Sequence, residues 1–414
     1  MEVRSGLLGR TLAHSYSPEI HGLLGDYEYK LFEMEEQDVG EFLKNGDFTG
    51  INVTIPYKKT VLPYMTEVSD TVRLTGSVNT VIRTPEGGLF GDNTDVYGFV
   101  QAVESARIKA AGKKALVLGS GGASVSVCAA LKILGAEAVV ISRSGEDNYD
   151  NIPKHYDADI IVNTTPVGMF PGNGEAPLSL SGFHYLEAVF DLIYNPARTA
   201  LLMEAETLGI PAFNGLHMLV AQAKKSSELF TDRMLPDRLI NSVVARIAAQ
   251  KGNIILVGMP GCGKTSVGKN LSRMTGRKHV DADLEFAAVC GKTPSEIILE
   301  EGEEQFRRME SDVLREIGKR SGIIISTGGG AVTRDENYCA LHQNGIIIWL
   351  RKDIDKLSSK GRPLSQSRDV HELYGERMPL YEKFADVAVD SGSTVSKTAK
   401  RVLAAYDSVA FKKS

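Results

Sequence analysis

The chain has 414 residues, of which 43% are hydrophobic and 24% charged, and its formal net charge is −5. That length exceeds what one hydrophobic core usually supports, so two or three domains are expected. There is no basic excess for nucleic acid and no apolar run near the roughly 18 residues of a membrane span, so neither is an expected partner. The N-terminus lacks a signal-peptide pattern and the four cysteines stand far apart, which indicates a cytoplasmic protein with reduced thiols.

Strand-like apolar runs alternate with helix-like segments in two successive series, as is typical of parallel α/β folds. A small mixed region reaches about Ser105, and the strands predicted after it are KALVLG, EAVVISRS, ADIIVNTT and AVFDLIY. The second series begins after residue 250 with NIILVG, RKHVDAD, GIIIST, GIIIWL and ADVAVDS, and closes with the helical pattern TVSKTAKRVLAAYDS. Between the series, a predicted helix ends at Lys251-Gly252, so the junction is short.

The first polar motifs of the chain combine a helix start with an exposed lysine. Ser15 and Ser17 stand just before a proline, a pattern typical of a helix start whose hydroxyls and N–H groups can face a small anion. Most such serines are structural caps, so this motif alone is weak. Alternating residues over 50–56 predict a strand that ends just before Lys58, which a loop would then present.

The order of the polar motifs is more informative than any one of them. Asn79 and Asp95 lie in turn-rich stretches that, taken singly, are more often turn or cap chemistry. With HSYSP, NVTIPYK, SVNT, DNTD, NTTPVGM, FDLIYNPARTALL and NGLHMLVAQA in this order, residues 5–230 resemble shikimate dehydrogenase. The resemblance implies that Lys58 and Asp95 are the catalytic pair, with Lys58 stabilising or protonating a ketone oxygen during hydride delivery. The substrate contacts that it implies are Ser15, Ser17, Thr54, Asn79, Tyr194 and Gln222.

A glycine-rich turn directly follows the predicted strand KALVL and opens a helix, which is the context of a dinucleotide site. After the next strand, Arg143 stands between two serines where an NAD enzyme usually carries an acidic residue, so NADP is the favoured cofactor. Glu146 and Asp147 close by argue the other way, and the second arginine often found in this family is missing. The predicted cofactor residues are Gly119, Gly121, Gly122, Ala123, Arg143 and Ser144.

The second series opens on a phosphate-binding motif. Residues 258–265 read GMPGCGKT between a predicted strand and a predicted helix, which is the context that supports a P-loop. Its N–H groups would hold the β-phosphate of ATP, Lys264 would neutralise phosphate charge, and Thr265 would bind Mg²⁺. The predicted ATP residues here are Gly261, Cys262, Gly263, Lys264 and Thr265.

A P-loop indicates the nucleotide but not the acceptor. The further motifs DAD, FR, GGG, GRPL and RMPLY make residues 251–414 resemble shikimate kinase. The resemblance implies that Asp281 helps to hold Mg²⁺ and that Asp283 is the base at the acceptor hydroxyl. It implies further that Arg362 closes over ATP from a lid, which is short for the family. The remaining substrate contacts implied are Arg307 and Arg377 on the carboxylate and Gly329 through its backbone.

The expected fold is α/β throughout, in three domains. An N-terminal substrate domain covers 1–104 and is completed by a returning helical segment over 217–248. A Rossmann NADP-binding domain covers 105–216, and a P-loop domain like those of nucleoside monophosphate kinases covers 251–414.

The resemblances imply a bifunctional enzyme that reduces 3-dehydroshikimate to shikimate with NADPH and phosphorylates shikimate with ATP, as a monomer or homodimer. A regulatory protein that has lost its chemistry is an alternative, which the intact Lys58, Asp95, Lys264 and Asp283 disfavour. A second alternative keeps the enzyme but changes its substrates, to quinate with NAD or to another small hydroxylated acid for the kinase.

Overall fold

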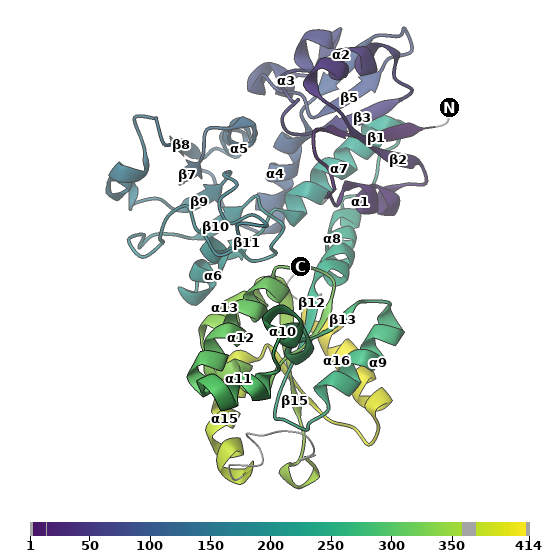
Figure 1. Ribbon diagram of the computed structural model, residues 1–414. Helices are drawn as coiled ribbons and strands as arrows, with labels where there is room; N and C mark the ends of the chain where they lie inside the picture. The colour runs from purple at the N-terminus through teal and green to yellow at the C-terminus, as the bar shows by residue number, and fades with distance from the viewer. Residues whose placement is uncertain (1–2, 14, 358–369, 411–414) are drawn as a thin grey trace. The chain divides into compact units, whose positions relative to one another are not determined.

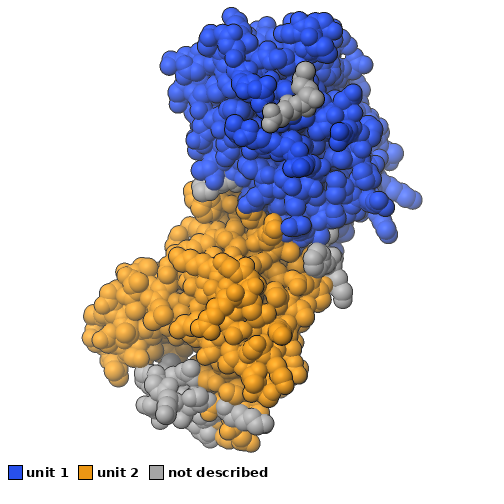
Figure 2. All heavy atoms as spheres, turned by 90° about the vertical axis from the view of Figure 1, so that its right-hand side faces the viewer, with its two compact units in different colours: residues 1–167, 176–194, 204–247 blue, residues 168–175, 195–203, 248–414 orange. Residues whose placement is uncertain are grey.

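The computed structural model of the chain describes residues 3–13, 15–357 and 370–410. These residues form two compact units (Figure 2). Unit 1 comprises 1–167, 176–194 and 204–247, and unit 2 comprises 168–175, 195–203 and 248–414. Each unit is α/β, as predicted, whereas the three finer domain bounds stay a prediction. In the described part of the chain, no helix is both long and apolar enough to cross a membrane.

The first sheet of unit 1 is a mixed one with the strand order β2-β1-β3-β5-β6-β4, of which β1, β2, β3 and β5 are labelled in Figure 1. β1, β2 and β3 are parallel to one another, whereas β5 runs antiparallel to both β3 and β6. Its strands are β1 Arg4–Gly9, β2 Glu28–Glu33, β3 Gly50–Val53, β4 Glu67–Val68, β5 Thr80–Arg83 and β6 Leu89–Asp92. The helical elements of this region are α1 Ser17–Leu24, α2 Glu36–Asn45, η1 Leu62–Tyr64, α3 Asp70–Thr75 and α4 Thr94–Ser105.

The second sheet of unit 1 is parallel, with the order β11-β10-β9-β7-β8. Four of its strands coincide with the apolar runs that predicted them, and the two-residue β11 has no sequence signal. The strands are β7 Lys114–Leu118, β8 Glu137–Ile141, β9 Ile160–Asn163, β10 Ala188–Asp191 and β11 Ala212–Phe213. The helices that follow them are α5 Gly122–Ile133, η2 Tyr149–His155, α6 Ala200–Thr207, α7 Leu216–Thr231 and α8 Arg238–Lys251.

The returning helix α7 packs along α4 and also contacts α1, β3 and β5 (Figure 1). It therefore brings residues near 220 back to the first sheet, as the sequence predicted. A serine followed by a proline predicts Ser17 as the N-cap with Pro18 as the first helical residue, and the observed helix start differs from this by one residue. α1 begins at Ser17 with Tyr16 as its N-cap, and Ser15 instead accepts a hydrogen bond from the Ser17 N–H with its Oγ (3.2 Å).

Unit 2 is built on a parallel sheet with the order β13-β14-β12-β15-β16. Its strands are β12 Asn253–Val257, β13 His279–Asp281, β14 Ile324–Ser326, β15 Gly345–Arg351 and β16 Val387–Asp390. Its helical elements are α9 Lys264–Thr275, α10 Ala282–Cys290, α11 Pro294–Glu301, α12 Glu303–Gly318, η3 Ala331–Thr333, α13 Glu336–His342, η4 Ile354–Lys356, α15 Val370–Phe384 and α16 Val395–Ala410.

Alternate residues of the central strands of unit 2 belong to two different cores. Ile254 and Leu256 lie in the cluster formed with α9 and α16, whereas Ile255 and Val257 lie in the cluster that includes residues of α12 and α15. Because helices cover both faces of the sheet, the strands read as continuous apolar runs, which is why the sequence revealed them.

Candidate active sites

The predicted catalytic pair of unit 1 is in direct contact. The Lys58 Nζ donates to Asp95 Oδ2 at 2.6 Å, from the turn after β3 to the first turn of α4. Both side chains are largely covered, with 21% and 11% of their surface exposed. Asn79, just before β5, donates from Nδ2 to the other carboxylate oxygen of Asp95 at 2.8 Å. Three polar groups from three segments are therefore held at one point.

Hydrogen bonds to the side-chain oxygen of Asn79 fix the orientation of its amide. Its Oδ1 accepts from the backbone N–H of Thr94 at 2.7 Å and lies 3.1 Å from the hydroxyls of both Thr94 and Thr80. A backbone N–H can only donate, so the oxygen must face it and the NH₂ group must face Asp95. Ser226 of α7 joins the two threonine hydroxyls at 2.9 and 3.1 Å. The returning helix thus supports the predicted catalytic pair through a buried hydroxyl cluster of Thr80, Thr94 and Ser226.

Tyr29 and Asn52 form a second set of hydrogen bonds to the same hydroxyl cluster. The Tyr29 hydroxyl donates to Asn52 Oδ1 at 2.8 Å, and Asn52 Nδ2 donates to Thr80 Oγ at 3.1 Å and to Ser226 Oγ at 2.8 Å. Burial raises the pKa of Tyr29 well above its usual range, against the opposing effect of a hydrogen bond with Ser17, so the hydroxyl stays protonated. Asn52, Thr80 and Ser226 were not predicted from the sequence, although Asn52 lies inside the motif NVTIPYK and Thr80 inside SVNT.

Of the remaining predicted substrate contacts of unit 1, Gln222 reaches the hydroxyl cluster, whereas Tyr194 and Thr54 are placed by other contacts. Gln222 is buried on α7, and its Oε1 is 3.3 Å from the Thr94 hydroxyl. The Tyr194 ring lies 4.9 Å from that of Tyr16, and burial raises the pKa of Tyr194. Thr54 follows β3 directly.

The predicted dinucleotide residues have the geometry of a strand, a turn and a helix. Gly119 follows β7 with φ 101°, and Gly121 is the N-cap of α5. A Cβ placed at Gly121 or Gly122 would meet nothing within 4 Å, so the start of the helix is open to a pyrophosphate, and Ala123 lies in its first turn. Arg143 and Ser144 are exposed just after β8. These residues fit a dinucleotide with a 2′-phosphate.

The P-loop of unit 2 joins β12 to α9. Lys264, 8% exposed, donates from Nζ to the carbonyl oxygens of Gly258 and Met259 at 2.7 and 3.2 Å, so its ammonium lies over the loop. Cys262 is buried, and a Cβ at Gly263 would meet nothing within 4 Å. The Thr265 hydroxyl donates to Asp281 Oδ2 at 2.7 Å.

The Thr265–Asp281 pair suits Mg²⁺, which usually takes few protein ligands and completes its shell with water and phosphate oxygens. Over residues 3–13, 15–357 and 370–410, no group of three or more His, Cys, Asp or Glu could hold a metal ion. Arg362, predicted to close over ATP, lies outside the described residues.

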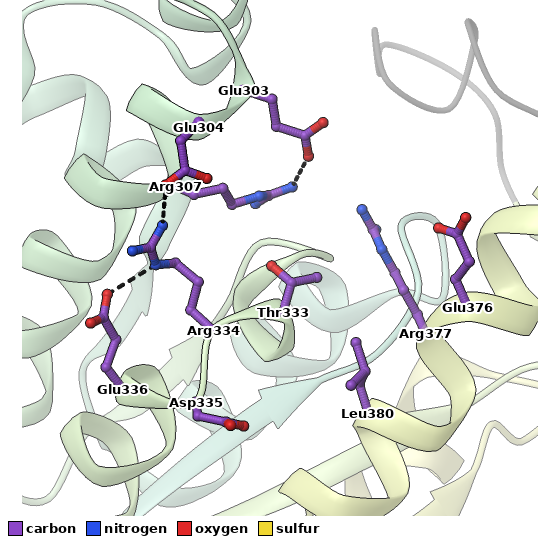
Figure 3. A pocket seen from close by; sticks show the side chains of 10 residues that line it. All are labelled: Glu303, Glu304, Arg307, Thr333, Arg334, Asp335, Glu336, Glu376, Arg377 and Leu380. Carbon is purple, nitrogen blue, oxygen red and sulfur yellow. Dashed lines mark hydrogen bonds and ion pairs between the residues drawn. The ribbon is translucent and has the colours of Figure 1, made fainter.

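Two guanidinium groups of unit 2 line one cavity of about 820 Å³ (Figure 3). Arg307 of α12 donates to Glu310 at 2.7 Å and to Glu303 at 3.0 Å. Burial opposes the charge on Arg307, but these two carboxylates outweigh it and its pKa is raised. Arg377 of α15 is 6% exposed, and burial lowers its pKa, with the nearby Arg307 cation adding to the effect. Such a pair of buried cations is suited to an anionic ligand.

The other acceptor-side residues lie close to these arginines. Glu310 is 4% exposed, burial raises its pKa, and its Oε1 has no hydrogen-bond partner in the described part of the structure. A Cβ added to Gly328 would meet that Oε1 at 2.5 Å and Asp283 Oδ1 at 3.1 Å, so the two carboxylates flank one backbone position. The Gly329 carbonyl accepts from the Tyr381 hydroxyl at 2.5 Å. Sequence reasoning missed Glu310, whose signal is its position three residues after Arg307 on one helix face.

Comparison with known proteins gives relatives for the N-terminal part. The NADP(+) shikimate dehydrogenase of Alkaliphilus oremlandii is 35% identical over 269 residues, which cover 56% of this chain and 92% of that protein. A chorismate mutase/shikimate 5-dehydrogenase fusion protein from Clostridium acetobutylicum is structurally similar, with a TM-score of 0.56, 34% identity and coverage of 60% and 97%. Shikimate 5-dehydrogenase from Thermus thermophilus, solved in complex with NADP(H) and shikimate, gives a TM-score of 0.55 at 31% identity, with coverage of 59% and 99%.

Two family models match separate stretches of the chain. Residues 7–81 match the shikimate dehydrogenase substrate binding domain, and residues 260–407 match shikimate kinase. Fold and sites together therefore define a two-part enzyme, an NADP-type oxidoreductase joined to a P-loop kinase. The chain belongs to the shikimate dehydrogenase family, and it carries a shikimate kinase domain after the dehydrogenase part. Both predicted resemblances are confirmed.

Proposed function

We propose that this chain catalyses two successive reactions, the NADPH-dependent reduction of 3-dehydroshikimate to shikimate and the ATP-dependent phosphorylation of shikimate to shikimate 3-phosphate. The observation that carries the proposal is the Lys58–Asp95 contact of 2.6 Å in unit 1, in a chain whose unit 2 holds a P-loop and two buried arginines. The first reaction makes the hydroxyl that the second one phosphorylates.

In unit 1, bound NADPH supplies a hydride to the ketone carbon. Lys58 stabilises the negative charge that develops on the ketone oxygen and donates the proton to it. Asp95 orients the ammonium, and Asn79 holds the Asp95 carboxylate in place with its NH₂ group. The proposed contacts to the rest of the substrate are Ser15, Ser17, Thr54, Asn79, Tyr194 and Gln222.

The proposed cofactor contacts follow the strand-turn-helix geometry after β7. The N–H groups of Gly121, Gly122 and Ala123 at the start of α5 would hold the pyrophosphate, since they leave its approach open. Arg143, with Ser144, would bind the 2′-phosphate that distinguishes NADP from NAD.

In unit 2, bound ATP supplies the phosphoryl group and Mg²⁺ neutralises part of its charge. Lys264 and the loop N–H groups would hold the phosphates, and Thr265 and Asp281, which lie in contact, would hold the metal. Asp283 accepts the proton of the substrate hydroxyl. These assignments are supported by the closeness of Thr265 to Asp281 and of Asp283 to the glycine turn at 328–330.

The proposed acceptor site is the cavity that Arg307 and Arg377 line. Two guanidinium groups match the planar carboxylate of shikimate, and burial strengthens their attraction for it. The free Oε1 of Glu310 would accept a hydrogen bond from a ring hydroxyl, and the backbone of Gly329 would contact the ring. Positioning of this kind is most of what phosphoryl transfer requires of a protein.

The decisive test is incubation of the full chain with 3-dehydroshikimate, NADPH and MgATP while NADPH loss and phosphorylated product are followed together. Lys58→Ala should abolish shikimate oxidation by NADP and leave ATP use with shikimate intact, and Lys264→Ala should do the reverse. Lys59→Ala and Lys269→Ala remove exposed lysines from the same segments and serve as matched controls. Loss of both activities in a single folded variant would reject two independent sites.

We also propose that the protein works in the cytoplasm, where both NADPH and ATP are supplied, as a monomer or homodimer. Light scattering of the purified chain against its 44.9 kDa mass distinguishes the two states.

A further inference from the structure

The loop after β8 folds back against the end of its own strand. The Ser142 N–H donates to the Asp147 carbonyl oxygen at 3.1 Å. Asn151 Nδ2 donates to the carbonyl oxygen of Glu146 at 2.8 Å, which holds the far side of the loop. Since the end of the second strand of a Rossmann sheet is where the ribose of the cofactor is read, the Asp147 backbone lies at that position.

An acidic side chain at this position normally favours NAD, because it accepts hydrogen bonds from the ribose hydroxyls and repels a 2′-phosphate. In this chain the carboxylate of Asp147 is engaged elsewhere. Its Oδ1 lies 2.9 Å from Nε2 of His155, the last residue of η2. The His155 side chain is 10% exposed and that of Asp147 39%, so the contact covers part of the carboxylate.

The histidine is well placed to keep this contact. His155 Nδ1 is buried and has no hydrogen-bond partner in the described part of the structure. A proton on that nitrogen would be buried without an acceptor, so the neutral ring should carry its proton on Nε2 and donate it to Asp147. The backbone of the histidine is fixed as well, because its carbonyl oxygen accepts from the Ala158 N–H at 3.0 Å.

The guanidinium of Arg143, the basic side chain of this loop, is available to bind a phosphate. Arg143 is exposed and, among the described residues, makes no ion pair with either acidic residue of the loop. Burial raises the pKa of Tyr149, the first residue of η2, and the Arg143 cation opposes that effect. A guanidinium without a carboxylate partner can accept a phosphate at no cost in broken ion pairs.

We propose that His155 is a positioning residue for cofactor choice, holding the Asp147 carboxylate away from the 2′-phosphate of NADP so that this carboxylate does not oppose Arg143 at that position. The inference rests on the proposed use of NADP. It explains how a loop with two acidic residues and one arginine can still select the phosphorylated dinucleotide.

The test is a fluorescence titration of the full chain with NADPH and with NADH, which reads binding without turnover. His155→Ala should release the Asp147 carboxylate and weaken NADPH binding about five- to tenfold, with less than about a twofold effect on NADH, and the loss should shrink at high ionic strength. The double variant His155→Ala/Asp147→Asn should restore NADPH binding. His155→Gln, which can still donate to Asp147, should keep it.

Asp150→Asn is the matched control, because it removes an exposed negative charge three residues after Asp147, at the start of η2. An unchanged ratio of the two dissociation constants in His155→Ala, or a double variant as weak as the single one, would overturn the proposal. If His155→Ala did not fold, Asp147→Asn alone would decide, and its NADPH affinity should change by less than about threefold. A larger gain in the NADPH affinity of Asp147→Asn would show that the carboxylate already faces the phosphate, and would overturn the proposal. If the unmodified chain bound neither dinucleotide, the proposed function itself would fail.

Discussion

Replacement of Thr80 by valine should weaken unit 1 and slow the dehydrogenase reaction while unit 2 is unaffected. Thr80 is fully buried, and its Oγ lies within 3.2 Å of four polar side-chain atoms, those of Asn52, Asn79, Thr94 and Ser226. Valine has nearly the same shape, so the change removes the hydroxyl without opening a cavity.

The magnitude follows from the partners left behind. Asn52 Nδ2 keeps Ser226 as an acceptor, and the Asn79 oxygen keeps the Thr94 donors, so none is fully orphaned. Each lost hydrogen bond costs about 0.5–1.5 kcal/mol net, and the Thr80 hydroxyl makes more than one, so about 1–3 kcal/mol is lost; for a unit of this size each kcal/mol lowers Tm by about 2–4 °C. A shift on the order of 5 °C is expected. Because Asn79 holds Asp95, kcat should fall several-fold with a smaller change in KM.

The assay can separate the units because Trp349 is the only tryptophan of the chain and lies buried in unit 2. Its fluorescence reports the unfolding of unit 2, whereas loss of dehydrogenase activity on heating reports unit 1. Thr80→Ser retains the hydroxyl and is the matched control. Unchanged thermal inactivation and kcat in Thr80→Val would refute the reasoning, and an equal shift of the Trp349 transition would contradict a local effect.

Two further predictions concern one site and one buried group. In Gly330→Ala the new Cβ would overlap the Arg307 guanidinium, so the kinase KM for shikimate should rise about tenfold while the dehydrogenase kinetics stay unchanged. Gly375→Ala is the control, because a Cβ there meets nothing within 4 Å, and it should change neither the kinase KM nor the dehydrogenase kinetics. Burial lowers the pKa of His21 from 6.5 to about 3, so between those values the unfolded chain binds a proton that the folded chain refuses. As the pH falls below 6.5, the free energy of unfolding of unit 1 should therefore decrease by about 1.4 kcal/mol per pH unit because of this group. In His21→Phe, the urea midpoint of unfolding should depend less on pH between about pH 6.5 and 5.

Much of the fold can be predicted from the sequence, because a strand whose sheet is buried on both faces appears as a continuous run of apolar residues. The strands of unit 2 and four strands of the second sheet were predictable for that reason. Of the first sheet only β3 was predicted, within the longer run 50–56, because most of the other strands are short or partly exposed and the sheet is mixed in direction. β11, with only two residues, owes its place to pairing with β10 and has no pattern of its own.

The candidate sites divide in the same way. Glycine turns and the P-loop depend on local spacing, so a sequence reveals them directly. The hydroxyl cluster behind Asn79 does not, because Ser226 stands 146 residues after Thr80 and only the packing of α7 brings them together. The contact of Asp147 with His155 is likewise invisible in the sequence, which shows an acidic residue near Arg143 but not the direction in which it points.

The two proposed sites differ in how they would hold the substrate carboxylate, a group that neither reaction changes. In unit 1 the proposed contacts are the neutral hydroxyls of Ser15 and Ser17, whereas in unit 2 they are two buried guanidinium groups. Charge-assisted pairs bind an anion more strongly than neutral hydrogen bonds do. Burial beside Arg307 also lowers the pKa of Arg377, a cost that a bound carboxylate would relieve. On these assignments shikimate leaves the first site easily and is captured firmly by the second, so the sequential reactions require no passage between the units.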